Sequence, residues 1–555
     1  MCGIWALISA KKITNYGAYY DLFMKTKHRG PDNSRFELIN DNVMLGFHRL
    51  AIMDLTVEGN QPFHHVRPDG SCVYCICNGE IYDFEQIKKD HNITTISKSD
   101  CEIIIPLYEK VGICEMVKIL GSEFAFIIVD INPNGKTLIH YATDPYGARP
   151  LFFATDNNGT QCFSSEMKSL TGIFKSIYRI SPGVLHIDEY INNVNKSNML
   201  IKIHSCYYDK VEYNIEPPKE KLNVNDIEFI YNEIQKRFIN CVKKRMHTNR
   251  PIGALLSGGL DSSLVCGVMK MLNPGLKFPV FTIAFTTGST DLPYAKKVAE
   301  FLDLQHYVIE VNPYDALKEI DETIYAIESY DITTVRASVV QRIIAKYIEK
   351  NTNIKVLLCG ENSDEVFQGY KYYHNQPSDI EGYKDSVSRV SDVHLFDGLR
   401  TDRTMAYHGL EVRLPFIDPE IVDFAFRIPP ELVRPLRGFE KTILRDSFKN
   451  LNILPEDVLY RSKEALSDGC SGKSKSWFEY IQEHIDNIVS DEEYQMNNVY
   501  EHCKPISKES YYYRKKFVGY FGNSDEVAQT IPYFWMPKWC PETNDPSART
   551  LNVYP

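Results

Sequence analysis

The pattern of hydrophobic and polar residues divides the chain into two parts. In the second part, apolar runs of strand length alternate with segments of helical spacing, which is typical of a parallel sheet with helices on its faces. A polar, proline-bearing segment at 216–221 separates the parts, so we expect a domain boundary near 210 to 225. The pattern predicts strands at Pro251–Leu256, Phe278–Phe285, His306–Val311 and Lys355–Cys359, and helices over Asp226–Met246 and after Ser263.

The first part is rich in strands separated by turn signals, as expected of an antiparallel sheet domain. A helix is expected to begin at Ser99 and to continue through Tyr108, because Ser99 and Glu102 form a capping pattern before an amphipathic run. The expected strands are Val43–Ile52, Glu123–Ile131, Thr137–Thr143, Pro150–Thr155 and Thr160–Ser164.

Length and composition limit the class of protein. At 555 residues and 43% hydrophobic composition, the chain is long enough for two domains, each with its own core. A net charge of −11 without a block of lysine and arginine argues against nucleic acid or an anionic membrane as partner, and favours small molecules. We also expect no membrane-spanning segment and no secretory signal. The 14 cysteines follow no framework of short spacings, which predicts a reducing, cytoplasmic location.

The most informative motif follows the first strand of the second part. Ser257-Gly258-Gly259-Leu260-Asp261-Ser262-Ser263 places two glycines and three hydroxyls between a strand and a helix. Backbone N–H groups and a helix N-terminus at such a turn bind a polyanion, and the carboxylate of Asp261 beside it implies a bridging Mg²⁺. A plain helix cap is the alternative interpretation. The whole string resembles the pyrophosphate loop of the ATP pyrophosphatases, which form adenylates.

A second candidate site begins at Cys2. Removal of Met1 would give Cys2 a free α-amino group, whose ordinary pKa of roughly 7.7–8.0 suits a base that activates the adjacent thiol. Asn78 and the N–H of Gly79 lie where a strand runs into a turn and are candidates for an oxyanion hole. Taken singly, each residue also has a structural interpretation, with Cys2 as a core residue and Asn78-Gly79 as a hairpin turn.

The order of these motifs with Arg49 and Asp100 resembles the glutaminase domain of the class II amidotransferases. The resemblance implies an N-terminal nucleophile fold, an αββα sandwich of two antiparallel sheets between helix layers. It also implies that Cys2 attacks the glutamine amide, that Asn78 and Gly79 stabilise the oxyanion, and that Arg49 holds the α-carboxylate. The glutamine site implied in this way comprises Arg49, Leu50, Ala51, Ile52, Met53, Asn78, Gly79, Glu80 and Asp100.

Three cysteines in one strand-like run form a competing candidate for a metal site. Cys72, Cys75 and Cys77 follow His64 and His65, but no second Cys/His pair occurs at the spacing of a zinc site. We expect these cysteines to be core residues.

A second acidic loop follows the last expected strand. Glu361, Asp364 and Glu365 lie within five residues, and such close carboxylates repel one another unless a cation or a donor-rich ligand lies among them. Since the carboxyl ends of parallel strands meet at one edge of the sheet, we expect this loop to lie near the pyrophosphate loop. A surface helix start is the alternative interpretation.

Together the motifs resemble the glutamine-dependent asparagine synthetase family, from Cys2 to Asp545-Pro546-Ser547. The resemblance implies a glutaminase domain at 1–210, an α/β ATP-pyrophosphatase domain with many helices at 211–535, and a tail at 536–555. It further implies Mg²⁺ bound with ATP as substrate, held by Asp261 and Asp364, no prosthetic group, and a role for Glu361 in the aspartyl step. The implied ATP contacts are Leu255, Ser257, Gly258, Gly259, Asp261, Ser262, Phe285, Cys359, Gly360 and Lys463, and the implied aspartate-site residues are Thr333, Thr334 and Arg336.

The chain departs from the family pattern in the second loop. Where the family usually has serine and glycine, this chain has Cys359 and Asn362. A nucleotide contact at Cys359 can come from its backbone, and asparagine tolerates a positive φ better than most residues, so we expect activity to survive.

The resemblance implies synthesis of L-asparagine from L-aspartate, L-glutamine and ATP, with ammonia passing from one site to the other. Three alternatives stay open: another amide-forming synthetase such as a β-lactam-forming enzyme, a glutamine-sensing module without activity, and amidation of a different carboxylate. Retention of Cys2 and of both acidic loops argues against the first two. A homodimer is compatible with the sequence but not dictated by it.

Overall fold

The computed structural model describes the chain except for residues 135, 158, 192–198, 207–221, 223–225 and 552–555. The expected boundary between residues 210 and 211 therefore lies outside the described residues. The chain divides into two compact units, which are described separately: Met1–Glu212, Ala406–Leu410 and Phe521–Thr530 form the first, and Tyr213–Met405, Glu411–Tyr520 and Ile531–Pro555 form the second.

The first unit contains two antiparallel sheets of six strands each. Their strand orders are β10-β8-β9-β1-β3-β2 and β12-β11-β7-β6-β5-β4. The first sheet comprises β1 (Gly3–Ile8), β2 (Asn33–Asn40), β3 (Val43–Arg49), β8 (Phe152–Thr155), β9 (Gln161–Ser164) and β10 (Ser176–Arg179); the second comprises β4 (Phe63–Val66), β5 (Cys72–Glu80), β6 (Glu123–Ile131), β7 (Lys136–Thr143), β11 (Val184–Ile191) and β12 (Met199–Cys206).

The period of two along β6 explains why the sheets form layers. Phe124, Phe126 and Ile128 point to a core shared with helices, whereas Ala125 and Ile127 point to the core between the two sheets. Because successive side chains on a strand face opposite sides, a strand that is apolar at every position is buried on both faces.

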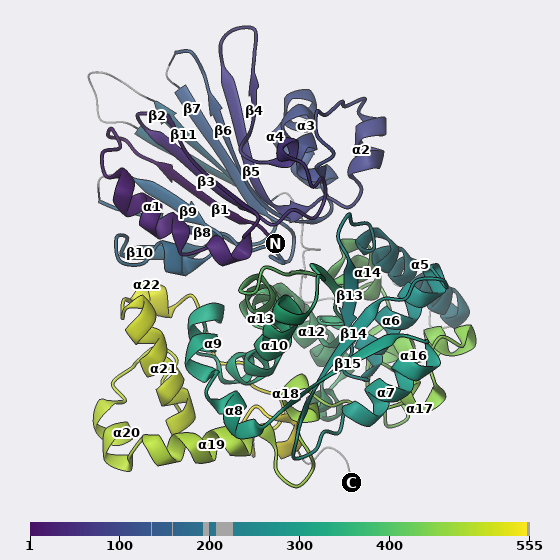
Figure 1. Ribbon diagram of the computed structural model, residues 1–555. Helices are drawn as coiled ribbons and strands as arrows, with labels where there is room; N and C mark the ends of the chain where they lie inside the picture. The colour runs from purple at the N-terminus through teal and green to yellow at the C-terminus, as the bar shows by residue number, and fades with distance from the viewer. Residues whose placement is uncertain (135, 158, 192–198, 207–221, 223–225, 552–555) are drawn as a thin grey trace. The chain divides into compact units, whose positions relative to one another are not determined.

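Helices complete the four layers of the first unit. Aromatic residues of α1 pack on Phe36 of β2, and the helices α2 to α4 cover the second sheet (Figure 1). This is the αββα fold class expected from the sequence. The helix expected from Ser99 begins as a short 3₁₀ turn, Asp100–Ile103, before α3. The helices are α1 (Tyr16–Met24), α2 (Phe84–Asp90), α3 (Ile104–Val111), α4 (Ile113–Ile119) and α22 (Asp525–Ala528).

The second unit is built on a parallel sheet of five strands in the order β15-β14-β13-β16-β17. Four of its strands were predicted, but the edge strand β17 is only three residues long and has no recognisable pattern. The chain moves outward from β13 to β15 and then continues on the other side with β16, so the order reverses between β13 and β16. The strands are β13 (Ile252–Leu255), β14 (Pro279–Phe285), β15 (Gln305–Val311), β16 (Val356–Leu358) and β17 (Glu411–Arg413).

Many helices surround this sheet, as expected, with α6 and α7 beside the strands that they connect (Figure 1). None of the described helices combines the length and the apolar composition that a bilayer crossing requires. The helices are α5 (Ile227–Arg245), α6 (Leu260–Leu272), α7 (Leu292–Phe301), α8 (Pro313–Leu317), α9 (Ile320–Ile327), α10 (Ile332–Asn351), α11 (Ser363–Val366), α12 (Asp379–Ser391), α13 (Asp397–Ala406), α14 (Pro419–Ala425), α15 (Pro430–Val433), α16 (Thr442–Phe448), α17 (Glu456–Leu459), α18 (Leu466–Gly469), α19 (Trp477–Ile488), α20 (Asp491–Asn497) and α21 (Lys508–Phe521).

A buried histidine makes the stability of the first unit depend on pH. His48 on β3 stacks on Phe23, its Nε2 lies 3.0 Å from the carbonyl oxygen of Phe23, and its Nδ1 lies 2.7 Å from the hydroxyl of Ser34. Because that carbonyl only accepts, Nε2 carries the proton and Nδ1 accepts from Ser34. Burial lowers the pKa of His48 from 6.5 to about 4.

We predict that His48→Gln makes the stability of the first unit less sensitive to acid. The unfolded chain takes up the His48 proton below pH 6.5, whereas the folded chain takes it up only near pH 4. His48 therefore destabilises the fold as the pH falls between these values, by up to roughly 3 kcal/mol. Hydrogen–deuterium exchange of β3 at pH 7 and pH 5 measures the effect. His64→Gln, at an exposed position, is the control, and an equal pH response of wild type and His48→Gln would contradict the prediction.

Candidate active sites

Pairing of β1 with β3 places Cys2 beside Leu50. The backbone N–H of Leu50 lies 3.4 Å from Sγ of Cys2, and the thiol lies 3.6 Å from the carbonyl oxygen of Leu50. Arg29 donates from Nε to the carbonyl oxygen of Cys2 at 2.9 Å. The thiol is therefore held at the end of the two strands, and its own amine becomes free only when Met1 is removed.

Asn78 has the properties of an oxyanion donor. Its side chain is fully buried, and among the described residues neither its amide nitrogen nor its amide oxygen has a partner. Burying an unpaired amide costs free energy unless a ligand completes it. The neighbouring Gly79 is required sterically, since a Cβ there would lie 2.7 Å from the carbonyl oxygen of Glu123.

The remaining residues of the predicted glutamine site lie in buried or half-buried positions around this strand end. Arg49 donates through Nη1 to the carbonyl of Thr56 at 2.6 Å and to Asn60 at 2.9 Å, so the loop after β3 orients its guanidinium. Asp100 accepts from the N–H of Ile81 at 2.6 Å. The buried members of this set are Arg49, Leu50, Ala51, Ile52, Met53, Glu80 and Asp100.

The pyrophosphate loop joins β13 to α6 as predicted. Gly258 has a φ of 76°, and a Cβ there would lie 2.3 Å from the backbone nitrogen of Ala295 on α7. Glycine is therefore needed for both its conformation and its packing. Ser257 and Ser262 fix the loop from within, since the Ser262 hydroxyl lies 3.1 Å from both the backbone nitrogen and Oγ of Ser257.

The acidic loop after β16 touches the pyrophosphate loop backbone to backbone. A Cβ on Gly360 would lie 2.5 Å from the carbonyl carbon of Asp261 and from the nitrogen of Ser262. Asn362 has a φ of 71°, in the left-handed region. Asparagine is among the few side chains that adopt this region readily, so it can stand where the sequence resemblance implies a glycine.

Two lysines hold the carboxylates of Asp261 and Asp364. Nζ of Lys441 lies 2.6 Å from both oxygens of Asp261 and 2.7 Å from Oδ1 of Asp364, and Nζ of Lys463 lies 2.6 Å from Oδ2 of Asp364. Burial alone would raise the pKa of Asp364, but the two lysines outweigh it and hold that pKa well below its usual range. Burial would likewise lower the pKa of Lys463, and the carboxylates keep it above its ordinary value.

This cluster fits the predicted magnesium ion. One ammonium group bridges both carboxylates, so oxygens of Asp261 and Asp364 lie within reach of a single cation. Carboxylate oxygens beside phosphate oxygens are the ligands that Mg²⁺ prefers. Asp261 and Asp364 would therefore hold Mg²⁺ together with the phosphates of ATP.

A cavity lies over the two loops, at the point where the strand order reverses. Open α/β sheets bind their ligands in this position. The C-terminal segment contributes Pro546, Ser547 and Ala548 to its wall. Among the predicted residues, those lining the cavity are Leu255, Ser257, Gly259, Asp261, Ser262, Thr333, Thr334, Arg336, Cys359, Gly360, Glu361, Asp364 and Lys463.

Two predicted nucleotide contacts are absent from this lining, within the part of the chain that the structure describes. Gly258 packs against α7, and Phe285 packs edge-on against Trp477 with ring centroids 5.1 Å apart. Because β13 ends at Leu255, opposite Phe281, the cavity lies over Phe281 to Ile283 and does not extend to Phe285. Ile283, two residues earlier on β14, lines the cavity.

The acidic and basic residues of the predicted aspartate step are paired. Glu361 receives two hydrogen bonds from Arg400, at 3.1 and 2.9 Å, and Arg400 also donates to Asp397 at 2.7 Å. Arg336 lies between Glu509 and Asp545, with Nη2 2.6 Å from Glu509 and 2.7 Å from Asp545.

The sequence interpretation missed Lys441, Arg400 and Ile283. No short motif marks them, because each reaches the cavity from a separate element. Only the structure shows that Lys441 precedes α16, whose residues are all buried, and a lysine buried there needs acidic partners.

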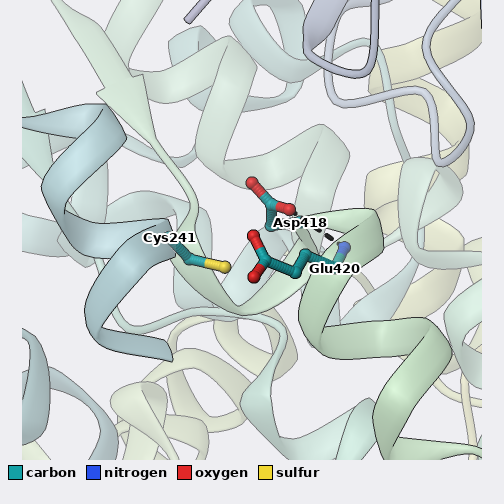
Figure 2. Close-up of side chains that lie close together, drawn as sticks. All are labelled: Cys241, Asp418 and Glu420. Carbon is teal, nitrogen blue, oxygen red and sulfur yellow. Dashed lines mark hydrogen bonds between the residues drawn. The ribbon is translucent and has the colours of Figure 1, made fainter. Parts of the chain in front are cut away.

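Metal binding outside this cavity has little support. Among the described residues, one further cluster of potential ligands contains Cys241, Asp418 and Glu420 (Figure 2). Arg245 binds Asp418 at 2.7 Å, Lys244 lies 3.2 Å from Asp418 and 3.4 Å from Glu420, and burial raises the pKa of the Cys241 thiol. Charged side chains therefore already neutralise these acids.

The predicted alternative of a metal site in the first unit also lacks support. Cys75 and Cys77 lie in the core between β5 and the helices, as expected, whereas Cys72, also expected in the core, is only half-buried. His64 and His65 are exposed on β4.

Fold and sites together define a glutamine amidotransferase joined to an ATP-pyrophosphatase domain. A sequence model of the glutamine amidotransferase domain matches residues 1–208, and a model of asparagine synthase matches residues 233–391 and 382–530. The glutamine-hydrolysing asparagine synthetase of Gallus gallus is 38% identical over 576 residues and that of Homo sapiens 39% over 577, and each comparison covers 100% of this chain and 99% of the relative. The chain belongs to the glutamine-hydrolysing asparagine synthetase family.

We predict that Lys441→Met makes the second unit dependent on Mg²⁺ for its stability. Without its ammonium group, Asp261 and Asp364 face one another without their shared cation, and breaking such a buried pair costs about 3–5 kcal/mol. Thermal melting with and without Mg²⁺ should show a low melting temperature that the metal raises more in the variant than in wild type. Lys449→Met, at an exposed position after the same helix, is the control. An equal response to Mg²⁺ in all three proteins would contradict the proposed magnesium site.

Proposed function

We propose that this protein makes L-asparagine from L-aspartate, with ATP as activator and L-glutamine as the source of ammonia. The observation that carries the proposal is the pair of carboxylates, Asp261 and Asp364, held together by Lys441 over a pyrophosphate loop at the switch point of the parallel sheet. Family membership supports the same reaction. None of the cysteines whose side chains the structure describes forms a disulfide, which supports a reducing, cytoplasmic location.

In the glutaminase reaction, Sγ of Cys2 attacks the side-chain carbonyl of glutamine, and the free α-amino group accepts the thiol proton. The developing oxyanion accepts hydrogen bonds from the amide of Asn78 and the N–H of Gly79, the donors that lie at the end of β5. The C–N bond then breaks, ammonia leaves with the proton, and water hydrolyses the remaining thioester to glutamate.

In the synthetase reaction, the side-chain carboxylate of aspartate attacks the α-phosphorus of ATP and pyrophosphate leaves. Mg²⁺ bound with ATP would supply neutralisation of phosphate charge. The chain's own contribution is the loop Ser257 to Ser262, which offers N–H and hydroxyl donors, and Lys463, which lies beside Asp364. Ammonia attacks the aspartyl carbonyl, and AMP leaves as asparagine forms.

Glu361 is proposed to assist this second step from the wall of the cavity. Arg400 fixes its carboxylate through two hydrogen bonds, so the group has one defined position. A carboxylate so placed can receive the proton that ammonia releases, or orient ammonia towards the carbonyl carbon.

We predict that Cys2→Ala abolishes glutaminase activity and glutamine-dependent synthesis but leaves synthesis from added ammonia unchanged. The substitution removes the nucleophile, which only the glutamine reaction uses. Asparagine, glutamate and AMP are quantified with either nitrogen source. Loss of ammonia-dependent synthesis in a folded variant would contradict the assignment, and failure of wild type to convert aspartate into asparagine would overturn the proposed function itself.

We predict that Glu361→Gln lowers asparagine formation by about 100-fold or more and leaves glutamine hydrolysis nearly unchanged. The amide keeps the volume of the side chain and one acceptor for Arg400, so a large loss reports on charge or proton transfer. Rates of asparagine and glutamate formation are compared in one reaction, with a melting curve as the check on folding. Wild-type rates for both products would show that Glu361 has no part in the chemistry.

A further inference from the structure

We propose that Gln341 is a specificity-determining residue that binds the α-carboxylate of the aspartate substrate through its side-chain N–H. Nothing in the sequence motifs marks this residue. The inference rests on the proposed function, and it adds a contact that selects which carboxylate substrate is amidated. It is carried by the position of Gln341 on α10, by the orientation of its amide, and by the lack of a hydrogen-bond partner for its nitrogen among the described residues.

One face of α10 forms a wall of the cavity. Thr334, Ala337, Gln341 and Ile344 recur at the spacing of a single helical face, and all four line the cavity together with Thr333. Gln341 is fully buried in the protein. Arg336, the other α10 residue with a long polar side chain in the cavity wall, is paired with Glu509 and Asp545, so Gln341 is the long neutral polar group on this wall.

The orientation of the Gln341 amide is determined by its neighbour. Nη1 of Arg400 donates to Oε1 of Gln341 at 3.3 Å. A guanidinium group has donors and no acceptor, so reversing the amide would bring two donors together. The oxygen therefore faces Arg400, and the NH₂ group is the end left for other contacts.

Among the described residues, Nε2 of Gln341 has no hydrogen-bond partner, and neither has the hydroxyl of Thr333 on the same wall. Buried donors in folded proteins are almost always paired. Two unpaired donors that line one cavity indicate an acceptor on the ligand.

The charges around Gln341 indicate which ligand group this is. The lysines that suit polyphosphate lie at the other loop, next to Asp261 and Asp364. Around Gln341, the positive charge of Arg400 is shared by Glu361 and Asp397, so this region has one carboxylate in excess. Such a region suits the ammonium group of an amino acid, and the carboxylate attached to the same carbon then needs neutral donors. Gln341 and Thr333 supply them.

The test measures synthesis with ammonia as nitrogen source, so that the glutaminase site does not enter. Gln341→Met should raise the KM for L-aspartate by about 10- to 100-fold and leave the KM for ATP unchanged, because a hydrogen bond to a charged group is lost. Gln341→Glu keeps the acceptor for Arg400 and replaces the donor by a negative charge, so its KM for aspartate should rise at least as much. Gln341→Glu also serves as a second test variant if Gln341→Met does not fold.

Two competitive inhibitors distinguish a contact from a structural effect. β-Alanine lacks the α-carboxylate of aspartate, and succinate lacks the α-amino group. The Ki of succinate should rise in Gln341→Met, whereas that of β-alanine should stay within about twofold of wild type. A parallel rise of both constants would show that the variant disturbs the cavity as a whole and would overturn the proposal.

Gln376→Met is the matched control. Gln376 is also a buried glutamine with an unpartnered amide among the described residues, but it does not line the cavity. Its variant should keep the wild-type KM for aspartate. If wild type forms asparagine and Gln341→Met has an unchanged KM for aspartate, the role of Gln341 is refuted and the proposed function stays intact. If wild type forms no asparagine, the proposed function itself is refuted.

Discussion

The synthetase unit depends on keeping two carboxylates close together. Asp261 and Asp364 come from loops more than a hundred residues apart, and unscreened they would repel one another. Lys441 and Lys463 provide the opposing charge, with contacts of 2.6 to 2.7 Å. Lys441 is itself buried, so the two carboxylates stabilise its positive charge just as it stabilises their negative charges. These charges therefore hold the two loops in place, with carboxylate oxygens where Mg²⁺ and polyphosphate would bind.

Close backbone approach is the second requirement of this site. Gly360 touches Asp261 and Ser262 at distances that admit no side chain, and Gly258 packs in the same way on α7. These glycines bring the ends of β13 and β16 together and leave the cavity over them. Asn362 keeps a left-handed backbone, although the sequence resemblance implies a glycine at this position.

In the glutaminase unit, strand register positions the residues of the candidate site. Gly3 pairs with His48, which places Cys2 beside Leu50, and the alternation along β5 buries Asn78 with its amide unpartnered among the described residues. The thiol of Cys2 contacts the backbone of Leu50, and Arg29 donates to the carbonyl oxygen of Cys2. The position of Cys2 follows from backbone pairing in a sheet whose two faces are both covered, so the thiol stays where the strand ends hold it.

The sequence by itself determined the fold class, most of the described strands, the helices α3, α5 and α6, and the motifs at both candidate sites. Periodicity reports burial along one element, and the motifs Cys2, Asn78-Gly79 and 257–263 are local strings whose chemistry can be read directly. Only the tertiary structure decided which distant side chains complete the sites. Lys441, Arg400 and Gln341 belong to no short motif, and they meet Asp261, Glu361 and the cavity because separate helices pack around one sheet. Phe285 shows the same limit: its strand was predicted correctly, but the point where β13 ends beside β14 decides that Ile283 lines the cavity instead.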